Sequence, residues 1–368
     1  MILSELMTQI RGLSYSKKDS TDKPLEGYLP VLRAGNIQNS QIIEDNYVYV
    51  PQELVKEKQY LKLGDILIAA SSGSLSIVGK AAMIKKDMQS SFGAFCKVLR
   101  PDTNQVDINY FKYFFETSYY KRTIKSLAEG ANINNLKTQH FDNLEIPLPP
   151  LDQQKKIAVI LDASDAYRQK TKALITKYDE LTQSLFLDMF GDPVSNPMGW
   201  ELFSFKDVLE IRNGKNQKTI ENENGIYPIC GSGGVMSYGD DYISEANSVI
   251  IGRKGNINKP ILMKERYWHV DTAFGLNPIR TVLGHDYLYW FCVRYNFEQH
   301  NKTVTIPSLT KETLLRIKIP TPTIALQNQF AERVQAIEAQ KAQAQASLAQ
   351  SEDLFNSLLQ RAFKGELL

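Results

Sequence analysis

The chain contains an internal repeat at the scale of a whole domain, and this feature limits its architecture more than any other. Eight residues of the first half recur in the second half without a gap, always separated by the 173 positions that lie between residue numbers 136 and 309. A repeat of this length predicts two similar units in one chain. The first-half residues are Leu136, Ile146, Pro147, Pro149, Gln154, Ser184, Leu185 and Phe190, and their counterparts are Leu309, Ile319, Pro320, Pro322, Gln327, Ser357, Leu358 and Phe363.

Upstream of this rigidly spaced part, the two halves resemble each other more loosely. Gly64-Asp65-Ile66-Leu67-Ile68 is similar to Ala246-Asn247-Ser248-Val249-Ile250-Ile251, and Gly93-Ala94-Phe95 is similar to Thr272-Ala273-Phe274, at larger and variable spacings. A repeat with a constant part and a variable part indicates one scaffold that carries two different heads.

The constant part predicts two long helices, over 151–191 and 324–368. Apolar residues recur at alternating three- and four-residue steps through about five heptads, which favours a coiled-coil spacer over ordinary core helices. A helix of roughly 38 residues is about 57 Å long, too long to pack fully against one head. The first stripe is Ile157, Ile160, Ser164, Tyr167, Thr171, Leu174, Tyr178, Leu181 and Leu185, and the second is Phe330, Val334, Ile337, Ala344, Leu348, Phe355 and Leu358.

The variable parts, residues 1–150 and 192–323, contain short apolar bursts bounded by glycine and serine, each followed by an aromatic-rich helical stretch. We therefore expect two α+β heads joined by two long helices packed as an antiparallel coiled coil, an internal pseudo-twofold repeat. The first head starts at Met1, where the second has the longer lead 200–206, so its first strand is expected to be short or absent.

Composition indicates a soluble globular protein of the cytoplasm. Hydrophobic residues make up 43% of the chain, and the three cysteines stand far apart without a CxxC pair. The amino terminus has no basic segment followed by an apolar one, so neither export nor membrane insertion is expected. The net charge of +2 says little about a nucleic-acid partner, because any basic surface must be local.

Catalytic patterns are missing from the sequence. None of the 41 acidic residues is followed two positions later by lysine, which excludes the common metal-dependent nuclease motif. The segment 196–200 (NPMGW) lacks the second proline of a methyltransferase motif, and the four histidines are scattered, so no metal site is predicted. Gly252-Arg253-Lys254-Gly255 does not match a phosphate loop, and its counterpart Ser71-Ser72-Gly73-Ser74 carries no lysine.

Three glycine-containing regions, two in the first head and one in the second, could contact DNA, because arginine pairs with guanine and asparagine with adenine. The alternative interpretation of these regions is a solvated charge cluster. The candidate DNA-binding residues are Arg33, Asn36, Ser71, Ser72, Ser74 and Lys80 in the first head and Arg253, Lys254, Asn256, Asn258 and Lys259 in the second.

Across essentially its whole length the chain resembles the specificity subunits of type I restriction-modification systems. The resemblance rests on the doubled Leu-x9-Ile-Pro-x-Pro motif at 136–149 and 309–322 and on the glutamines that open both helices. It also rests on the segment Ser-Leu-Phe-Leu-Asp-Met-Phe-Gly-Asp-Pro at 184–193 and on 196–200 at the start of the second head. The order and duplication of these motifs are more specific than any one of them.

This resemblance implies that each head is a target recognition domain that reads one half of a split, asymmetric double-stranded DNA site. The helices would fix the gap and dock two modification subunits, which supply the adenine methyltransferase and its S-adenosylmethionine. Separate restriction subunits would supply the nuclease and motor with ATP and Mg²⁺, so this chain would be non-catalytic and hold no cofactor. The residues expected to form the spacer and docking surface are Ile157, Leu161, Leu174, Leu181, Leu185, Phe330, Val334, Ile337, Leu348, Phe355 and Leu358.

Two other classes remain open. In the first, the coiled coil is itself the function and the heads bind proteins, which the weak overall charge favours. It predicts no methylation and no salt-dependent DNA binding, whereas phosphate contacts make affinity fall as salt rises. In the second, the chain is an enzyme that acts alone, and this requires a catalytic constellation that the sequence does not offer.

Overall fold

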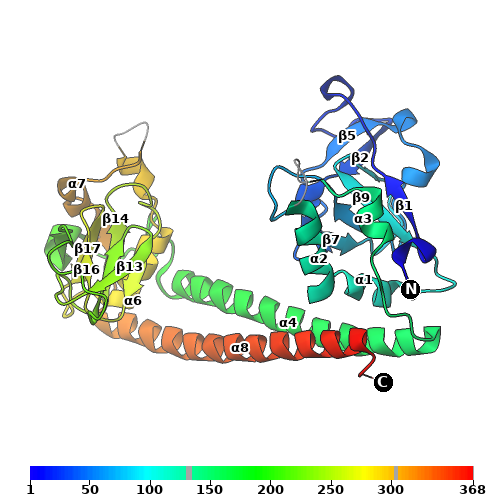
Figure 1. The fold of residues 1–368 in the computed structure, drawn as a ribbon. Helices are drawn as coiled ribbons and strands as arrows, with labels where there is room; N and C mark the ends of the chain where they lie inside the picture. The colour runs from blue at the N-terminus through cyan, green and yellow to red at the C-terminus, as the bar shows by residue number, and fades with distance from the viewer. Residues whose placement is uncertain (130–134, 302–305, 368) are drawn as a thin grey trace. The chain divides into compact units, whose positions relative to one another are not determined.

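The computed structural model describes residues 1–129, 135–301 and 306–367. The chain divides into two compact units, the first made of Met1–Thr171 with Ser347–Leu368 and the second of Lys172–Ala346 (Figure 1). Each unit combines one α+β head with parts of two long helices, so the predicted fold class is confirmed. Within the described residues, no helix is both long and apolar enough to cross a membrane.

The first head is built around a four-stranded antiparallel sheet in the order β1-β9-β6-β7. A three-stranded sheet, in the order β5-β2-β8, and a small β3-β4 hairpin accompany it. The strands are β1 (Met7–Arg11), β2 (Tyr28–Leu32), β3 (Ile37–Gln38), β4 (Gln41–Ile42), β5 (Val48–Pro51), β6 (Ile66–Ala69), β7 (Ala81–Met83), β8 (Ser91–Phe92) and β9 (Cys96–Pro101). The helices are α1 (Ile108–Phe114), α2 (Ser118–Glu129) and α3 (Thr138–Asp142), with 3-10 turns at Leu3–Glu5, Lys17–Asp19, Ala34–Asn36, Gln52–Leu54 and Glu57–Gln59.

The second head repeats this arrangement. Its four-stranded sheet has the order β11-β17-β14-β15, its three-stranded sheet the order β13-β12-β16, and β10 pairs with β18. The strands are β10 (Leu202–Ser204), β11 (Leu209–Asn213), β12 (Tyr227–Gly231), β13 (Gly234–Gly239), β14 (Ser248–Gly252), β15 (Ile261–Met263), β16 (Trp268–His269), β17 (Ala273–Pro278) and β18 (Lys318–Pro320). The helices are α5 (Phe205–Val208), α6 (His285–Arg294) and α7 (Lys311–Leu315), with a 3-10 turn at Phe297–His300.

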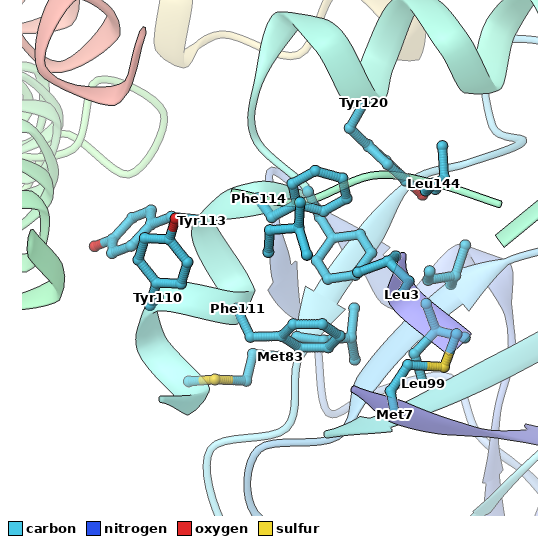
Figure 2. Close-up of a cluster of buried hydrophobic side chains, with 14 of the residues drawn as sticks. Leu3, Met7, Met83, Leu99, Tyr110, Phe111, Tyr113, Phe114, Tyr120 and Leu144 are labelled. Atoms are coloured by element: carbon cyan, nitrogen blue, oxygen red, sulfur yellow. The ribbon is translucent and has the colours of Figure 1, made fainter. Parts of the chain in front are cut away.

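An aromatic core closes the first head. Helix α1 carries four buried aromatic residues, of which Phe111 and Phe114 lie toward Leu3, Met7 and Leu99, whereas Tyr110 and Tyr113 point to the opposite side (Figure 2). Burial of such side chains is the main favourable term in folding. The four aromatic residues are Tyr110, Phe111, Tyr113 and Phe114.

Two long helices, α4 (Leu151–Phe190) and α8 (Ile324–Lys364), run through both units. They pack antiparallel, because early residues of α4 meet late residues of α8. In the first unit the Arg168 guanidinium lies 4.0 Å from the centroid of the Phe355 ring. In the second unit the Lys341 ammonium donates to the Asp179 carboxylate at 2.5 Å, which joins α8 to α4.

The heptad spacing of both helices is confirmed, but half of the α4 stripe was predicted one residue out of register. The inward positions of α4 are Leu161, Arg168, Ile175 and Thr182, whereas Tyr167, Leu174 and Leu181 are 56%, 43% and 49% exposed. Two of the four inward residues, Arg168 and Thr182, are polar, so the large apolar residues next to them in sequence led to the wrong register. The α8 stripe was placed correctly, from Phe330 to Leu358.

A buried glutamine joins each head to its helix, which explains why this residue is repeated. The Gln154 side-chain nitrogen donates to the carbonyl oxygens of Pro149 and Gln105, and its oxygen accepts from the Asp107 backbone. In the second unit Gln327 makes the same three kinds of bond. Its partners there are Pro322, Val282 and Gly284.

The first strand of the first head is short, as expected. It is reduced to a bridge between Ile2 and Glu145, with Leu3 donating to the Leu144 carbonyl at 2.8 Å. The second head has a full strand pair, β10 with β18, at the equivalent place. The edge of the first head is nevertheless hydrogen-bonded.

Candidate nucleic-acid interface

The first head contains a cleft of about 1220 Å³ that brings together four of its six predicted DNA-binding residues. Arg33, Asn36, Ser71 and Ser72 all line it, although 35 positions separate the first pair from the second in sequence. Residues of the 33–47 segment and of the turn after β6 line the same cleft. The other lining residues are Leu13, Ser14, Tyr15, Ala34, Gly35, Gln38, Asp45, Asn46, Gly73, Gly93, Ala94, Phe95 and Cys96.

Asn36 holds the cleft wall in place. It is 3% exposed, and its side-chain nitrogen donates to the Ile43 and Asp45 carbonyls at 2.9 and 2.7 Å. Its side-chain oxygen accepts from the Arg33 backbone at 2.9 Å. These bonds occupy both N–H groups of the amide. As a DNA contact, Asn36 stays a prediction, and its observed role is to shape the loop.

Arg33 and Phe95 are two of the exposed residues that line this cleft. The Arg33 guanidinium donates to the Asn46 carbonyl at 3.0 Å while its side chain remains exposed, and Phe95 is 70% exposed. Burial raises the pKa of the Cys96 thiol to about 12 and also raises the pKa of Tyr15. Both groups are therefore neutral near pH 7, and the cleft offers hydrogen-bond donors, an aromatic face and a cation rather than a nucleophile.

The remaining two candidates of the first head lie outside this cleft. The Ser74 hydroxyl is 2.8 Å from the Ser76 hydroxyl on the turn after β6. Lys80 lines a second cleft of about 710 Å³, together with Asn39, Ser40 and Lys121. Sequence reasoning missed Asn39, Ser40 and Lys121, because Asn39 and Ser40 form a turn without glycine and Lys121 lies on α2.

In the second head the five predicted residues form one exposed loop between β14 and β15. The backbone nitrogens of Arg253 and Lys254 donate to the Thr272 carbonyl at 2.8 and 3.2 Å, which fixes the start of the loop. Asn258 fixes its end, because it bonds with the Asn296 side chain and the Phe297 backbone. Asn256 and Lys259 are exposed between these anchors.

The two heads present different residues from the same backbone positions. Ser71 forms a bridge with Asn135, and Lys254 forms the equivalent bridge with Ser308. These equivalent bridges make Lys254, rather than Gly252, the structural counterpart of Ser71. One scaffold position therefore carries a neutral hydroxyl in the first head and an ammonium group in the second.

Most residues predicted for the spacer and docking surface are packed inside the units. Ile157, Leu161 and Phe355 are buried against the first head, and Phe330 and Val334 against the second. In these positions the five side chains attach the long helices to the heads. The partly buried members are Leu185, Ile337, Leu348 and Leu358, and the exposed members are Leu174 and Leu181.

The buried histidine of the second head, His269, is neutral near pH 7. His269 is fully buried, and burial lowers its pKa to about 4. One ring nitrogen is 3.1 Å from the Arg212 carbonyl. Among the described residues, no group of three or more histidine, cysteine, aspartate or glutamate side chains could hold a metal ion.

Comparison with known proteins identifies the family. The model of the family described as the type I restriction modification DNA specificity domain matches residues 2–181 and 197–350, and the chain belongs to this family. It is 39% identical over 241 residues to the type I restriction enzyme EcoKI specificity subunit of Escherichia coli K12, a match that covers 62% of this chain. It is 43% identical over 179 residues to the StySPI specificity subunit of Salmonella potsdam, which covers 49% of this chain.

These matches span only part of the relatives. The first covers 51% of the Escherichia coli protein and the second 38% of the Salmonella protein, so the chain matches about half or less of their length. Among solved structures, the type I restriction-modification S subunit from M. genitalium has a TM-score of 0.60 with this chain. The likeness covers 99% of this chain and 95% of that chain at 17% identity, and at this identity it supports the fold alone.

Proposed function

We propose that this protein is the sequence-specific DNA-binding specificity subunit of a type I restriction-modification complex, and that each head reads one half of a bipartite, asymmetric site. The observation that carries this proposal is the duplicated scaffold with unlike loops. Ser71 in the first head and Lys254 in the second follow equivalent strands and make equivalent bridges. Two heads with the same frame and different contact residues suit two different half-sites.

The helices α4 and α8 act as the spacer between the half-sites. The two helices pack on each other at heptad spacing. The buried glutamines Gln154 and Gln327 attach each head to the start of one helix. Because the helix length is fixed, the unread gap in the DNA site is fixed with it.

Modification subunits dock on the outer face of the long helices. Leu174 and Leu181 lie one heptad apart on α4 and are 43% and 49% exposed, so two apolar side chains are accessible on the same face of this helix. The complex takes two modification subunits, which bring S-adenosylmethionine, and restriction subunits, which bring ATP and Mg²⁺. This chain contributes recognition without a cofactor of its own, in the cytoplasm.

Co-expression of the chain with a modification subunit of the same system tests this function. Genome-wide mapping of N6-methyladenine by long-read sequencing should show one split, asymmetric motif. A stable complex that methylates nothing would move the assignment to a protein-binding scaffold. Methylation without sequence preference would exclude a specificity role.

A further inference from the structure

The β3-β4 hairpin is an insertion of the first head. In the second head β12 turns directly into β13 through Ser232 and Gly233. In the first head residues 33–47 separate the equivalent strands β2 and β5, and they contain the hairpin. Since the flanking strands pair alike in both heads, the insertion is an addition to the scaffold rather than part of it.

The base of the hairpin is anchored in the protein. Ile37 is 2% exposed in a hydrophobic cluster, and Ile42 packs against the same cluster. The Ile43 backbone nitrogen donates to the Asn36 carbonyl at 2.9 Å, beside the buried Asn36 side chain. These contacts hold the hairpin in one orientation.

The tip of the hairpin is tight and polar. Asn39 and Ser40 have φ values of 50° and 59°, the pair of positive values that a type I′ turn requires. Gln38, Asn39 and Ser40 are exposed. The Gln38 side-chain nitrogen donates to the Gly35 carbonyl at 3.1 Å. This bond uses one N–H of the amide and fixes the direction of the second N–H and of the side-chain oxygen.

The hairpin forms a ridge between two clefts. Gln38 lines the larger cleft together with Arg33 and also the carboxylate-bearing Asp45. Asn39 and Ser40 line the smaller cleft together with Lys80 and Lys121. A neutral amide ridge is therefore flanked on each side by cationic side chains.

We propose that the β3-β4 hairpin of the first head is its base-reading element, with Gln38 and Asn39 contacting adenine edges in the major groove. The major groove admits a two-stranded β-ribbon, and an amide side chain pairs with adenine through one donor and one acceptor. The flanking cations then face the phosphate strands on either side. This inference rests on the proposed function and names the element through which the first head performs it.

The inference is tested with the complex of the full chain and its modification subunit, using the wild-type methylated motif as probe. Affinity is measured for duplexes in which each base pair of the two half-sites is changed in turn. Gln38→Ala and Asn39→Ala are compared with Gln52→Ala, a matched change of an exposed amide elsewhere on the first head. Salt dependence is measured for each protein.

We expect Gln38→Ala and Asn39→Ala to lose about 5- to 150-fold of the discrimination at one or two adjacent positions of one half-site. The other half-site, the gap and the salt slope should be unchanged, because the deleted amides are neutral. Gln52→Ala should match the wild type. A second pair of variants, Gln38→Glu and Asn39→Asp, should shift preference at those positions from adenine toward cytosine, whose amino group donates to a carboxylate.

Unchanged discrimination at every position in all four variants would overturn the inference while leaving the proposed function intact. Loss of affinity for every duplex, including non-specific DNA, would also overturn it, because neutral base contacts do not carry non-specific binding. If the wild-type complex itself shows no preference for a split motif, the proposed function fails first.

Discussion

The side-chain nitrogen of Gln154 donates a hydrogen bond to the carbonyl oxygen of Pro149 at 2.8 Å, where the chain leaves the first head and begins α4. Gln327 and Pro322 form the same bond at 2.8 Å at the start of α8. Both glutamines are 1% exposed. Each head is thus fixed to its helix by a buried polar side chain, and a polar group in such a place stabilises the fold only while all its partners remain.

Gln154→Ala should lower the free energy of unfolding by about 2 to 4 kcal/mol, because it leaves buried backbone groups of Asp107 and Pro149 without a partner. Urea unfolding followed by circular dichroism measures this change. The matched control is Gln153→Ala, which alters an exposed amide on the same helix turn and should cost less than about 0.5 kcal/mol. Equal effects of the two changes would contradict the role given to Gln154.

Acidification should destabilise the second unit through His269. Burial lowers the pKa of this imidazole to about 4, whereas an unfolded histidine titrates near 6.5. The native state therefore holds fewer protons, so stability is complete above pH 6.5 and declines as pH falls toward 4. The loss should be on the order of 3 kcal/mol across this window.

The measurement for His269 is unfolding free energy against pH, compared with His269→Gln. The variant cannot titrate, so its curve should be flatter between pH 6.5 and 4. Parallel curves for the two proteins would show that other groups cause the acid sensitivity.

A shorter spacer should change the gap in the DNA site. Deletion of residues 172–178 from α4 requires a matched deletion of 342–348 from α8, because the helices pack antiparallel and the pair Asp179–Lys341 must be kept. One heptad is about 10 Å of helix. The methylated motif, mapped by long-read sequencing, should keep its two half-sites and change the unread spacing between them. An identical motif would contradict the idea that the helices set the gap.

Cations of the second head should contribute to salt-dependent DNA binding. Arg253 and Lys254 begin an exposed loop, so Arg253→Gln and Lys254→Gln should each reduce the slope of log affinity against log salt by about 1. The slope is measured with the complete complex by titration at several salt concentrations. Gln substitution of Lys206, an exposed residue on α5, serves as the control. A slope unchanged in both loop variants would remove this loop from the DNA interface.

The doubled scaffold was predictable because the repeated residues are apolar residues and turn residues, and they recur at a constant spacing. The α4 register was harder. Its inward positions hold Arg168 and Thr182, while Leu174 and Leu181 face outward, so hydrophobicity alone misplaced them. The repeat could have corrected this error, since the constant spacing pairs Leu161 with Val334 of the correctly placed α8 stripe.

The candidate interface was only partly predictable. Basic charge and glycine content mark Arg33 and the Arg253 loop in the sequence, but neither feature marks the β3-β4 hairpin. That hairpin turns through Asn39 and Ser40 at positive φ without a glycine, and it carries neutral amides. Nor could sequence reveal that Asn36 would be buried, because its burial depends on carbonyls of Ile43 and Asp45 supplied by the same loop.

Exchange of one head tests the central claim most directly. Residues 200–322 of this chain would be replaced by the corresponding head of another family member, and N6-methyladenine would be mapped genome-wide in cells that also express the modification subunit. The account predicts a split motif in which one half changes and the other half stays the same. A motif that changes in both halves, or in neither, would contradict the assignment of one half-site to each head.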